Sequence, residues 1–137
     1  MSEFWGWAVA VYAQPGVAEA CLDLQDSHGQ NVPLLLWAIW RGGDVPAAVA
    51  LARSWEDEVV GPLRGVRRRL KGRAGADALR EKVKAVELDA EQTLISALET
   101  LAGPVPDPHA LTAVVQAWGG AVSSEALIRL AALITAA

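Results

Sequence analysis

Residues 77–101 read DALREKVKAVELDAEQTLISALETL and form the longest periodic segment of the chain. Apolar residues recur in it every three or four positions, which is the spacing of one face of an α-helix. The residues of this apolar stripe are Leu79, Val83, Val86, Ala90, Leu94, Ala97, Leu98 and Leu101. The segment therefore predicts one long amphipathic helix, and we expect it to form the central spine of the fold.

The segments on both sides show the same spacing, and none alternates between apolar and polar residues as a half-buried strand does. Proline, glycine and capping residues divide them into shorter helices. The expected helices cover about residues 2–13, 15–28, 32–40, 45–60, 62–71, 108–118 and 124–137. We therefore predict an all-α, compact, bundle-like domain of six to eight helices, with residues 1–137 as a single domain.

Short polar residues stand where several of these helices are expected to begin, and their side chains can accept hydrogen bonds from free backbone N–H groups. The expected N-cap residues are Ser2, Asn31, Asp44, Asp107 and Ser123. Pro15 suits the first position of the second helix. Gly61-Pro62 is expected to break or kink the helix that reaches it, because proline lacks a backbone donor.

Composition excludes several classes of protein for this chain. The 137 residues are 53% hydrophobic and 20% charged, which predicts a folded globular chain. A single cysteine, Cys21, excludes an internal disulfide and favours a reducing compartment. No basic residue precedes Arg41, so a signal-peptide n-region is missing, and no apolar run approaches the about 20 residues of a membrane-spanning helix. We expect a cytoplasmic protein that does not contact a membrane.

Charge is distributed unevenly along the chain. Residues 61–86 hold nine basic and two acidic side chains, a net charge of +7. Since the whole chain carries −4, the remainder carries −11. An asymmetry of this size is typical of a protein with a charged interaction surface.

The basic residues of the helix predicted at about 62–71 gather on one side. Arg64, Arg67, Arg68 and Lys71 follow the i, i+3, i+4, i+7 spacing of one helical face, which we expect to point to water. Three interpretations remain open: a solvated face that pairs with the protein's own acidic segments, a docking surface for an acidic protein partner, or a site for the phosphates of nucleic acid or another ligand. The excess negative charge elsewhere disfavours a long polyanion. We predict a non-enzymatic interaction or regulatory module that docks through this face.

The polar residues Gln25, Asp26 and His28 precede the apolar run 32–40 and raise the alternative of a catalytic or small-ligand site. Asp26 and His28 point in nearly opposite directions on a helix, so the helix does not bring them together. A helix junction accounts for the same residues: His28 lies in a last turn, Gly29 supplies a left-handed C-cap and Asn31 caps the next helix. We therefore predict a structural corner, with no catalytic residue.

Motifs for other chemistry are missing. The sequence contains no phosphate-binding loop, no dinucleotide fingerprint, no HExxH and no EF-hand loop. The two histidines, His28 and His109, lie far apart, and Glu87 with Glu91 lacks the histidine that a di-iron bundle places three residues after a glutamate. We expect no metal and no cofactor.

Two apolar features complete the prediction. Trp37, Trp40 and Trp55 occur at helical spacing, which favours a place in the core. The C-terminal segment 126–137, in which only Arg129 and Thr135 are polar, is apolar around nearly its whole circumference, so it lies centrally in the bundle or is covered by a second copy of the chain. We expect a homodimer that pairs through this helix.

Several short stretches also resemble a known family. They are Pro15-Gly16-Val17, Leu24-Gln25-Asp26, His28-Gly29, Asn31-Val32 with Leu34–Leu36, Trp55, and Pro62-Leu63-Arg64 with Arg67-Arg68. This pattern resembles a family of short, Trp-rich proteobacterial proteins known only as a domain of unknown function, over roughly the first 100 residues. The resemblance implies a shared fold and transfers no activity, cofactor, partner or catalytic residue.

Overall fold

The computed structural model describes residues 3–119 and 124–135. These residues form eight α-helices and one π-helix, and no β-strand occurs among them. The helices are α1 Glu3–Tyr12, α2 Val17–His28, α3 Val32–Trp40, α4 Val45–Trp55, η1 Glu56–Val60, α5 Gly61–Leu70, α6 Asp77–Glu99, α7 Ala110–Trp118 and α8 Ser124–Thr135. The predicted all-α class and the predicted long helix are confirmed.

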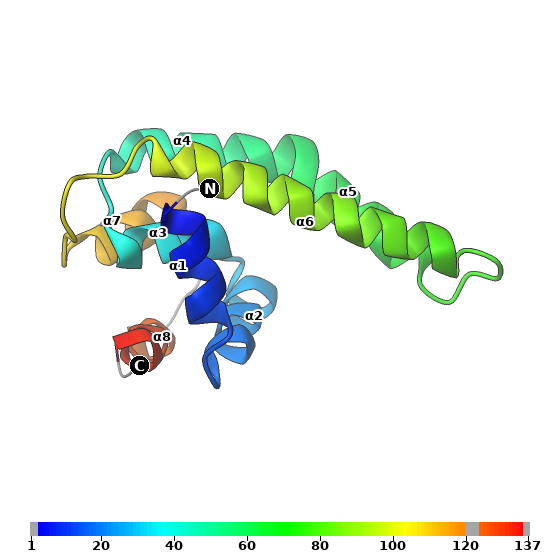
Figure 1. The fold of residues 1–137 in the computed structure, drawn as a ribbon, viewed down its shortest axis with the longest axis horizontal. Coiled ribbons are helices and arrows are strands. Elements are labelled where there is room, and N and C mark those ends of the chain that lie inside the picture. Colours follow the sequence, from blue (N-terminus) through cyan, green and yellow to red (C-terminus); the bar gives the residue numbers. More distant parts are fainter. Residues whose placement is uncertain (1–2, 120–123, 136–137) are drawn as a thin grey trace.

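A two-helix arm projects from the body of the molecule (Figure 1). Helices α4, η1 and α5 follow one another as one continuous rod, and α6 returns alongside it after the loop 71–76. The C-terminal half of α6 packs on α1, α3 and α4, whereas its N-terminal half contacts α5. We call α5 and the N-terminal half of α6, residues 61–86, the arm.

The long helix is central over only half of its length. Leu94, Ile95 and Leu98 are buried in the core, whereas Leu79 and Val86 in the arm are 53% and 51% exposed. The predicted stripe therefore changes its surroundings along the helix, because only α5 is available to cover its first half. The expectation of a central spine along the whole segment was wrong for the arm.

Aromatic side chains pack in the core, as predicted. Trp37 is fully buried, and Phe4 stacks on Trp40 with 4.8 Å between the ring centroids. Trp40 and Trp55 are partly buried and pack against the same core. The indole nitrogen of Trp55 donates a hydrogen bond of 2.8 Å to the carbonyl of Ala90, which ties α4 to α6.

Side-chain caps fix two helix starts. The Oδ1 atom of Asn31 accepts a hydrogen bond from the backbone N–H of Leu34 at 3.0 Å, and Asp44 accepts one from Ala47 at 3.2 Å. Both predicted caps are confirmed. Asp107 accepts a bond of 2.9 Å from the N–H of His109, one residue before α7, so it caps the preceding turn instead. The predicted caps Ser2 and Ser123 lie outside the described residues.

The second helix begins later than predicted. It starts at Val17, and Gly16 before it has a left-handed φ of 84°. Pro15 consequently lies in the turn between α1 and α2, not in the first helical position. At the other end, Gly29 adopts the left-handed conformation expected of a C-cap, with φ 63°.

The helix that reaches Gly61-Pro62 neither ends nor breaks. The chain passes through the π-helical turn Glu56–Val60, in which the N–H of Gly61 donates to the carbonyl of Glu56, five residues earlier. A wider turn suits this position because Pro62 has no N–H for the usual bond and its ring crowds the preceding turn. A Cβ atom at residue 61 would lie 2.7 Å from the Glu56 carbonyl oxygen, so the turn requires glycine.

One face of the last helix is buried against another helix of the same chain. Helix α8 packs on α2, with Leu130 and Ile134 buried and Leu127 and Leu133 partly buried. Among the large apolar side chains described in α8, Ile128 is the one that remains exposed, at 68%. The helix is therefore neither central nor bare, and the expected homodimer stays a prediction. None of the described helices combines the length and the apolar character needed to span a membrane.

Candidate functional site

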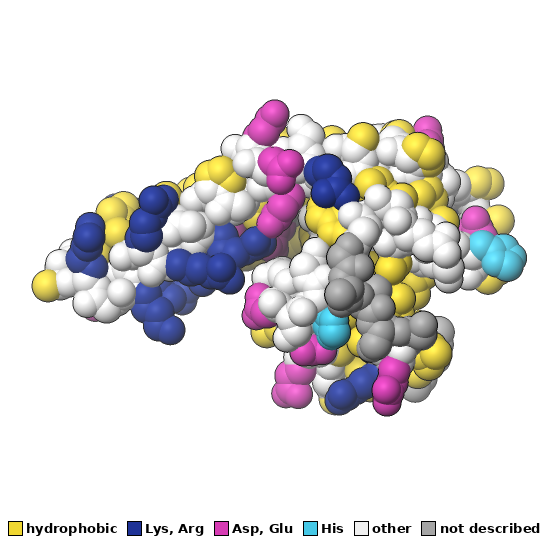
Figure 2. Space-filling model, turned by 180° about the vertical axis from the view of Figure 1, so that it is seen from behind, with side chains coloured by type: hydrophobic (Ala, Val, Ile, Leu, Met, Phe, Trp, Pro, Cys, Tyr) yellow, Lys and Arg dark blue, Asp and Glu magenta, His cyan; other side chains and the backbone are white. Residues whose placement is uncertain are grey.

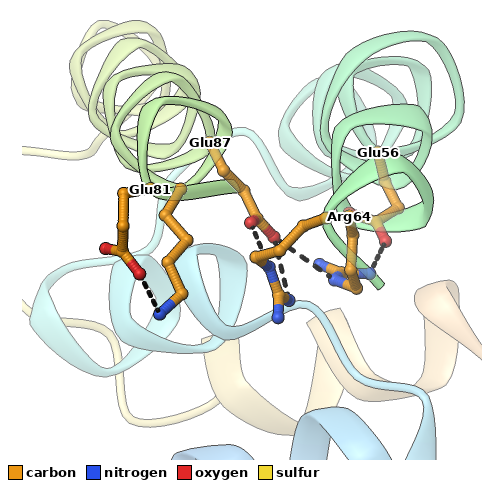
Figure 3. A network of polar contacts seen from close by, with 6 residues as sticks. Glu56, Arg64, Glu81 and Glu87 are labelled. Carbon is orange, nitrogen blue, oxygen red and sulfur yellow. Dashed lines mark hydrogen bonds and ion pairs between the residues drawn. The ribbon is translucent and has the colours of Figure 1, made fainter. Parts of the chain in front are cut away.

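A network of ion pairs joins the arm to the helices beside it (Figure 3). A guanidinium nitrogen of Arg64 lies 2.7 Å from Oε1 of Glu56, and its Nε lies 3.8 Å from Oε1 of Glu87. Arg67 binds the same Glu87 through two nitrogens, at 2.6 and 3.3 Å. A single carboxylate of α6 thus connects two arginines of α5, while η1 supplies the second carboxylate.

Burial distinguishes this network from an ordinary surface pair. The side chains of Arg64 and Glu87 are 16% and 11% exposed. The hydrogen bonding of Arg67, which donates to the Glu87 carboxylate, raises the pKa of Arg67, with burial acting in the opposite direction. A planar guanidinium with two bonds to one carboxylate is among the stronger polar contacts in proteins. The network therefore fixes how α5 lies against α6.

The structure divides the predicted basic face into two parts. Arg64 and Arg67 turn inward to Glu56 and Glu87, so the expectation that they point to water was wrong. Glu56 lies eight residues before Arg64 on the same continuous rod, whereas Glu87 lies 20 residues after Arg67 and meets it because α6 folds back on α5. Arg68 and Lys71 are exposed, as expected.

Exposed cations surround the end of the arm. Those on α5 and in the loop are Arg68, Arg69, Lys71 and Arg73, and those on α6 are Lys82 and Lys84. We call these six residues the arm cations. Lys84 lies 3.3 Å from a carboxylate oxygen of Glu81, and the other five have no acidic partner in the described part of the chain. Figure 2 shows most of the basic side chains of that face on the projecting arm, whereas acidic side chains and a few basic ones lie on the body.

The structure does not assemble Gln25, Asp26 and His28 into one site. Gln25 lines a groove beneath the arm, and Asp26 is exposed. His28 ends α2 with its Nε2 atom 3.7 Å from Asp23, and it lines a different cavity of about 330 Å³ between α2 and α8.

The corner has a structural role that extends to α7. The indole of Trp118 donates a hydrogen bond of 2.9 Å to the carbonyl of Gly29. The buried Gln30 donates from its side chain to the carbonyl of Gly119 at 3.0 Å. The prediction did not single out Gln30, because its partner is 89 residues away and no local pattern marks it.

Burial disfavours Cys21 as a reactive group. Its thiol is buried, and burial raises its pKa to about 11. A neutral, inaccessible thiol is a poor nucleophile and a poor metal ligand. Within residues 3–119 and 124–135, no group of three or more metal-binding side chains comes together.

Comparison with known proteins identifies the family. Residues 3–98 match the family described as "Protein of unknown function (DUF2390)". The chain belongs to this family. The match covers α1 to α5 and nearly all of α6, and so it includes the arm and its ion-pair network. No curated protein and no solved structure matches the chain.

Proposed function

We propose that this protein is a non-enzymatic interaction module of the cytoplasm, which docks on an acidic surface of a partner protein through the arm. One observation carries the proposal: six exposed cations cluster on a two-helix element that projects from the body (Figure 2). A projecting basic element can reach into a concave acidic surface and accelerate the encounter with it.

The docking residues differ from those expected from the sequence. Arg64 and Arg67 are already neutralised by Glu56 and Glu87, so they position α5 instead of meeting a partner. Among the four predicted residues, Arg68 and Lys71 remain for docking, and Arg69 and Arg73 join them. The arm also exposes Val66 and Leu79, which offer apolar area next to the charges.

A protein partner fits this surface better than nucleic acid does. Residues outside 61–86 carry a net charge of −11, which repels a long polyanion lying across the molecule. A local acidic patch on a protein avoids that repulsion because it meets only the arm. Binding of nucleic acid or of another phosphate-bearing ligand through the same cations is the alternative.

The proposal is tested by affinity capture with the triple variant Arg68→Glu/Arg69→Glu/Lys71→Glu beside the wild type. Arg69→Glu and Arg129→Glu form a matched pair, because both reverse one exposed charge but only Arg69 lies on the arm. We expect a specific acidic protein to bind the wild type and Arg129→Glu, to bind Arg69→Glu more weakly, and to be lost from the triple variant.

Two controls separate the alternatives. Binding should fall at about 1 M salt, where charges are screened beyond about 3 Å. Purified wild type and triple variant are also titrated with a random-sequence DNA duplex. Tight, salt-dependent DNA binding that the triple variant loses would favour the nucleic-acid alternative. Capture of the same protein by the wild type and the triple variant would contradict docking through the arm.

A further inference from the structure

A groove of about 610 Å³ runs beneath the arm, between α1, α2, the start of α3 and α6. Its walls are largely apolar and include Trp5, Val9, Tyr12, Leu22, Leu88 and Ile95. This volume lies within the range of about 300–1,000 Å³ that is usual for sites of small organic ligands. The groove does not involve the arm cations, so its role is separate from the proposed docking surface.

The apolar wall is unusually open to water. Nine large apolar side chains stand out as exposed among the described residues, and four of them, Val9, Tyr12, Leu22 and Leu88, line this one groove. Single exposed apolar residues are common on protein surfaces, but a contiguous group marks a place where something binds. The wall would lose its contact with water if an apolar body filled the groove.

Polar groups converge at one end of the groove. Gln25, Arg67, Glu87 and Glu91 line it there. Glu91 and Gln25 also line a second cavity of about 180 Å³, which continues to Glu56 and Arg64 on the other side. Glu91 therefore stands between the two cavities, at the point where the apolar walls give way to the ion-pair network.

The charges at this end do not balance. Arg64 and Arg67 neutralise Glu56 and Glu87, with which they form their ion pairs. Glu91 adds one further negative charge, and within the described residues it makes no hydrogen bond and no ion pair. Burial raises the pKa of Glu91, and the Glu87 and Glu56 carboxylates raise it further, against the lowering effect of Arg64 and Arg67. Burial and the neighbouring carboxylates thus disfavour the charged form of Glu91, and a cation beside it would stabilise that form.

We propose that the groove binds a small organic amine, with its apolar body between α1, α2 and α6 and its protonated nitrogen paired with Glu91. The apolar walls account for the body, and the uncompensated carboxylate accounts for the positive charge. A carboxylate ligand does not fit, because Arg67 is already held by Glu87 and the remaining charge is negative.

Matched probes of two body shapes test the proposal. Tryptamine is compared with tryptophol and indole-3-propionate, and octylamine with octanol and octanoate, by calorimetric titration of the full chain at pH 7. In at least one series the amine should bind about tenfold more tightly than the alcohol and the acid, the difference expected for one charge-assisted contact. Equal affinity within both series, or no binding in either, would overturn the proposal.

Variants then locate the amine. Glu91→Gln should remove the preference for the amine over the alcohol while leaving the alcohol affinity unchanged. Val9→Trp, which fills the groove, should weaken amine and alcohol alike, whereas Leu79→Trp on the arm should weaken neither. Thermal unfolding of each variant confirms that it is folded. An amine preference that survives Glu91→Gln in a folded protein would contradict the assignment of Glu91.

Discussion

Glu91 has a consequence for stability as well as for binding. Burial, with the Glu87 carboxylate on the same helix, raises its pKa, although Arg64 and Arg67 of α5 oppose the rise. Tyr12 and Glu56 are the other titratable groups that act on it from neighbouring helices. A carboxyl whose pKa is raised by folding binds more protons in the folded state, so stability falls as pH rises from the unfolded to the folded pKa.

Glu91→Gln should therefore raise the melting temperature at pH 7, because the amide carries no charge to bury. The gain should disappear below about pH 4, under the ordinary pKa of a glutamate, since the wild-type carboxyl is then protonated as well. Melting curves of both proteins between these pH values measure it. The exposed Glu58→Gln serves as the control and should show no such pH-dependent gain. A variant less stable than the wild type at pH 7 would mean that the charged Glu91 is stabilised in the folded protein, and it would contradict this assignment.

Asn31 supplies a second test at the scale of one residue. Its side chain accepts the N–H of Leu34 at 3.0 Å, and the residue is buried. Asn31→Ala removes this cap and should lower the free energy of unfolding by about 1 kcal/mol. Urea denaturation measures the change. A loss near zero would mean that water replaces the cap, which its burial argues against.

At the scale of helices, Gly61 and Gly65 lie in the same helix and should respond in opposite ways to alanine. Alanine normally stabilises a helix by about 1 kcal/mol relative to glycine. A Cβ atom at residue 65 would meet only a guanidinium nitrogen of Arg69, at an ordinary contact distance of 3.8 Å, so Gly65→Ala should follow that rule. At Gly61 the new methyl group would meet the Glu56 carbonyl oxygen at 2.7 Å, so Gly61→Ala should destabilise by about 1–3 kcal/mol. Equal stabilisation by both substitutions in urea titrations would mean that the π-helical turn is not required.

The helices themselves could be predicted from the sequence because their signals are local. Apolar spacing and the caps at Asn31 and Asp44 specify where helices lie, and the structure confirms them. The π-helical turn at Glu56–Val60 could not be predicted, since proline and glycine together indicate a break as readily as a wider turn. The inward turn of Arg64 and Arg67 also has no local signal, because Glu87 reaches them only through the hairpin of α5 and α6.

At the scale of the whole molecule, charge and shape act together. Most of the basic residues lie on the arm, away from a body with excess negative charge, so the two regions carry net charges of opposite sign (Figure 2). The distribution of charge along the sequence predicted this asymmetry, but it did not predict that the basic residues would lie on a projecting helical hairpin. Nor could the groove beneath the arm be predicted, since its walls come from five helices that meet only in the folded chain.

The basic residues of α5 divide into positioning residues and surface residues, and chemical denaturation tests this division without knowledge of any partner. Two double variants are compared with the wild type. Arg64→Gln/Arg67→Gln removes both cations from the ion-pair network. Arg68→Gln/Arg69→Gln removes the same amount of charge from the surface. The first should lower the free energy of unfolding by about 3 kcal/mol or more, because Glu87 is left buried without a partner. The second should change it by less than about 0.5 kcal/mol per residue, as is usual for exposed sites. Equal losses from the two variants would contradict the division, and with it the assignment of the arm cations as the docking surface.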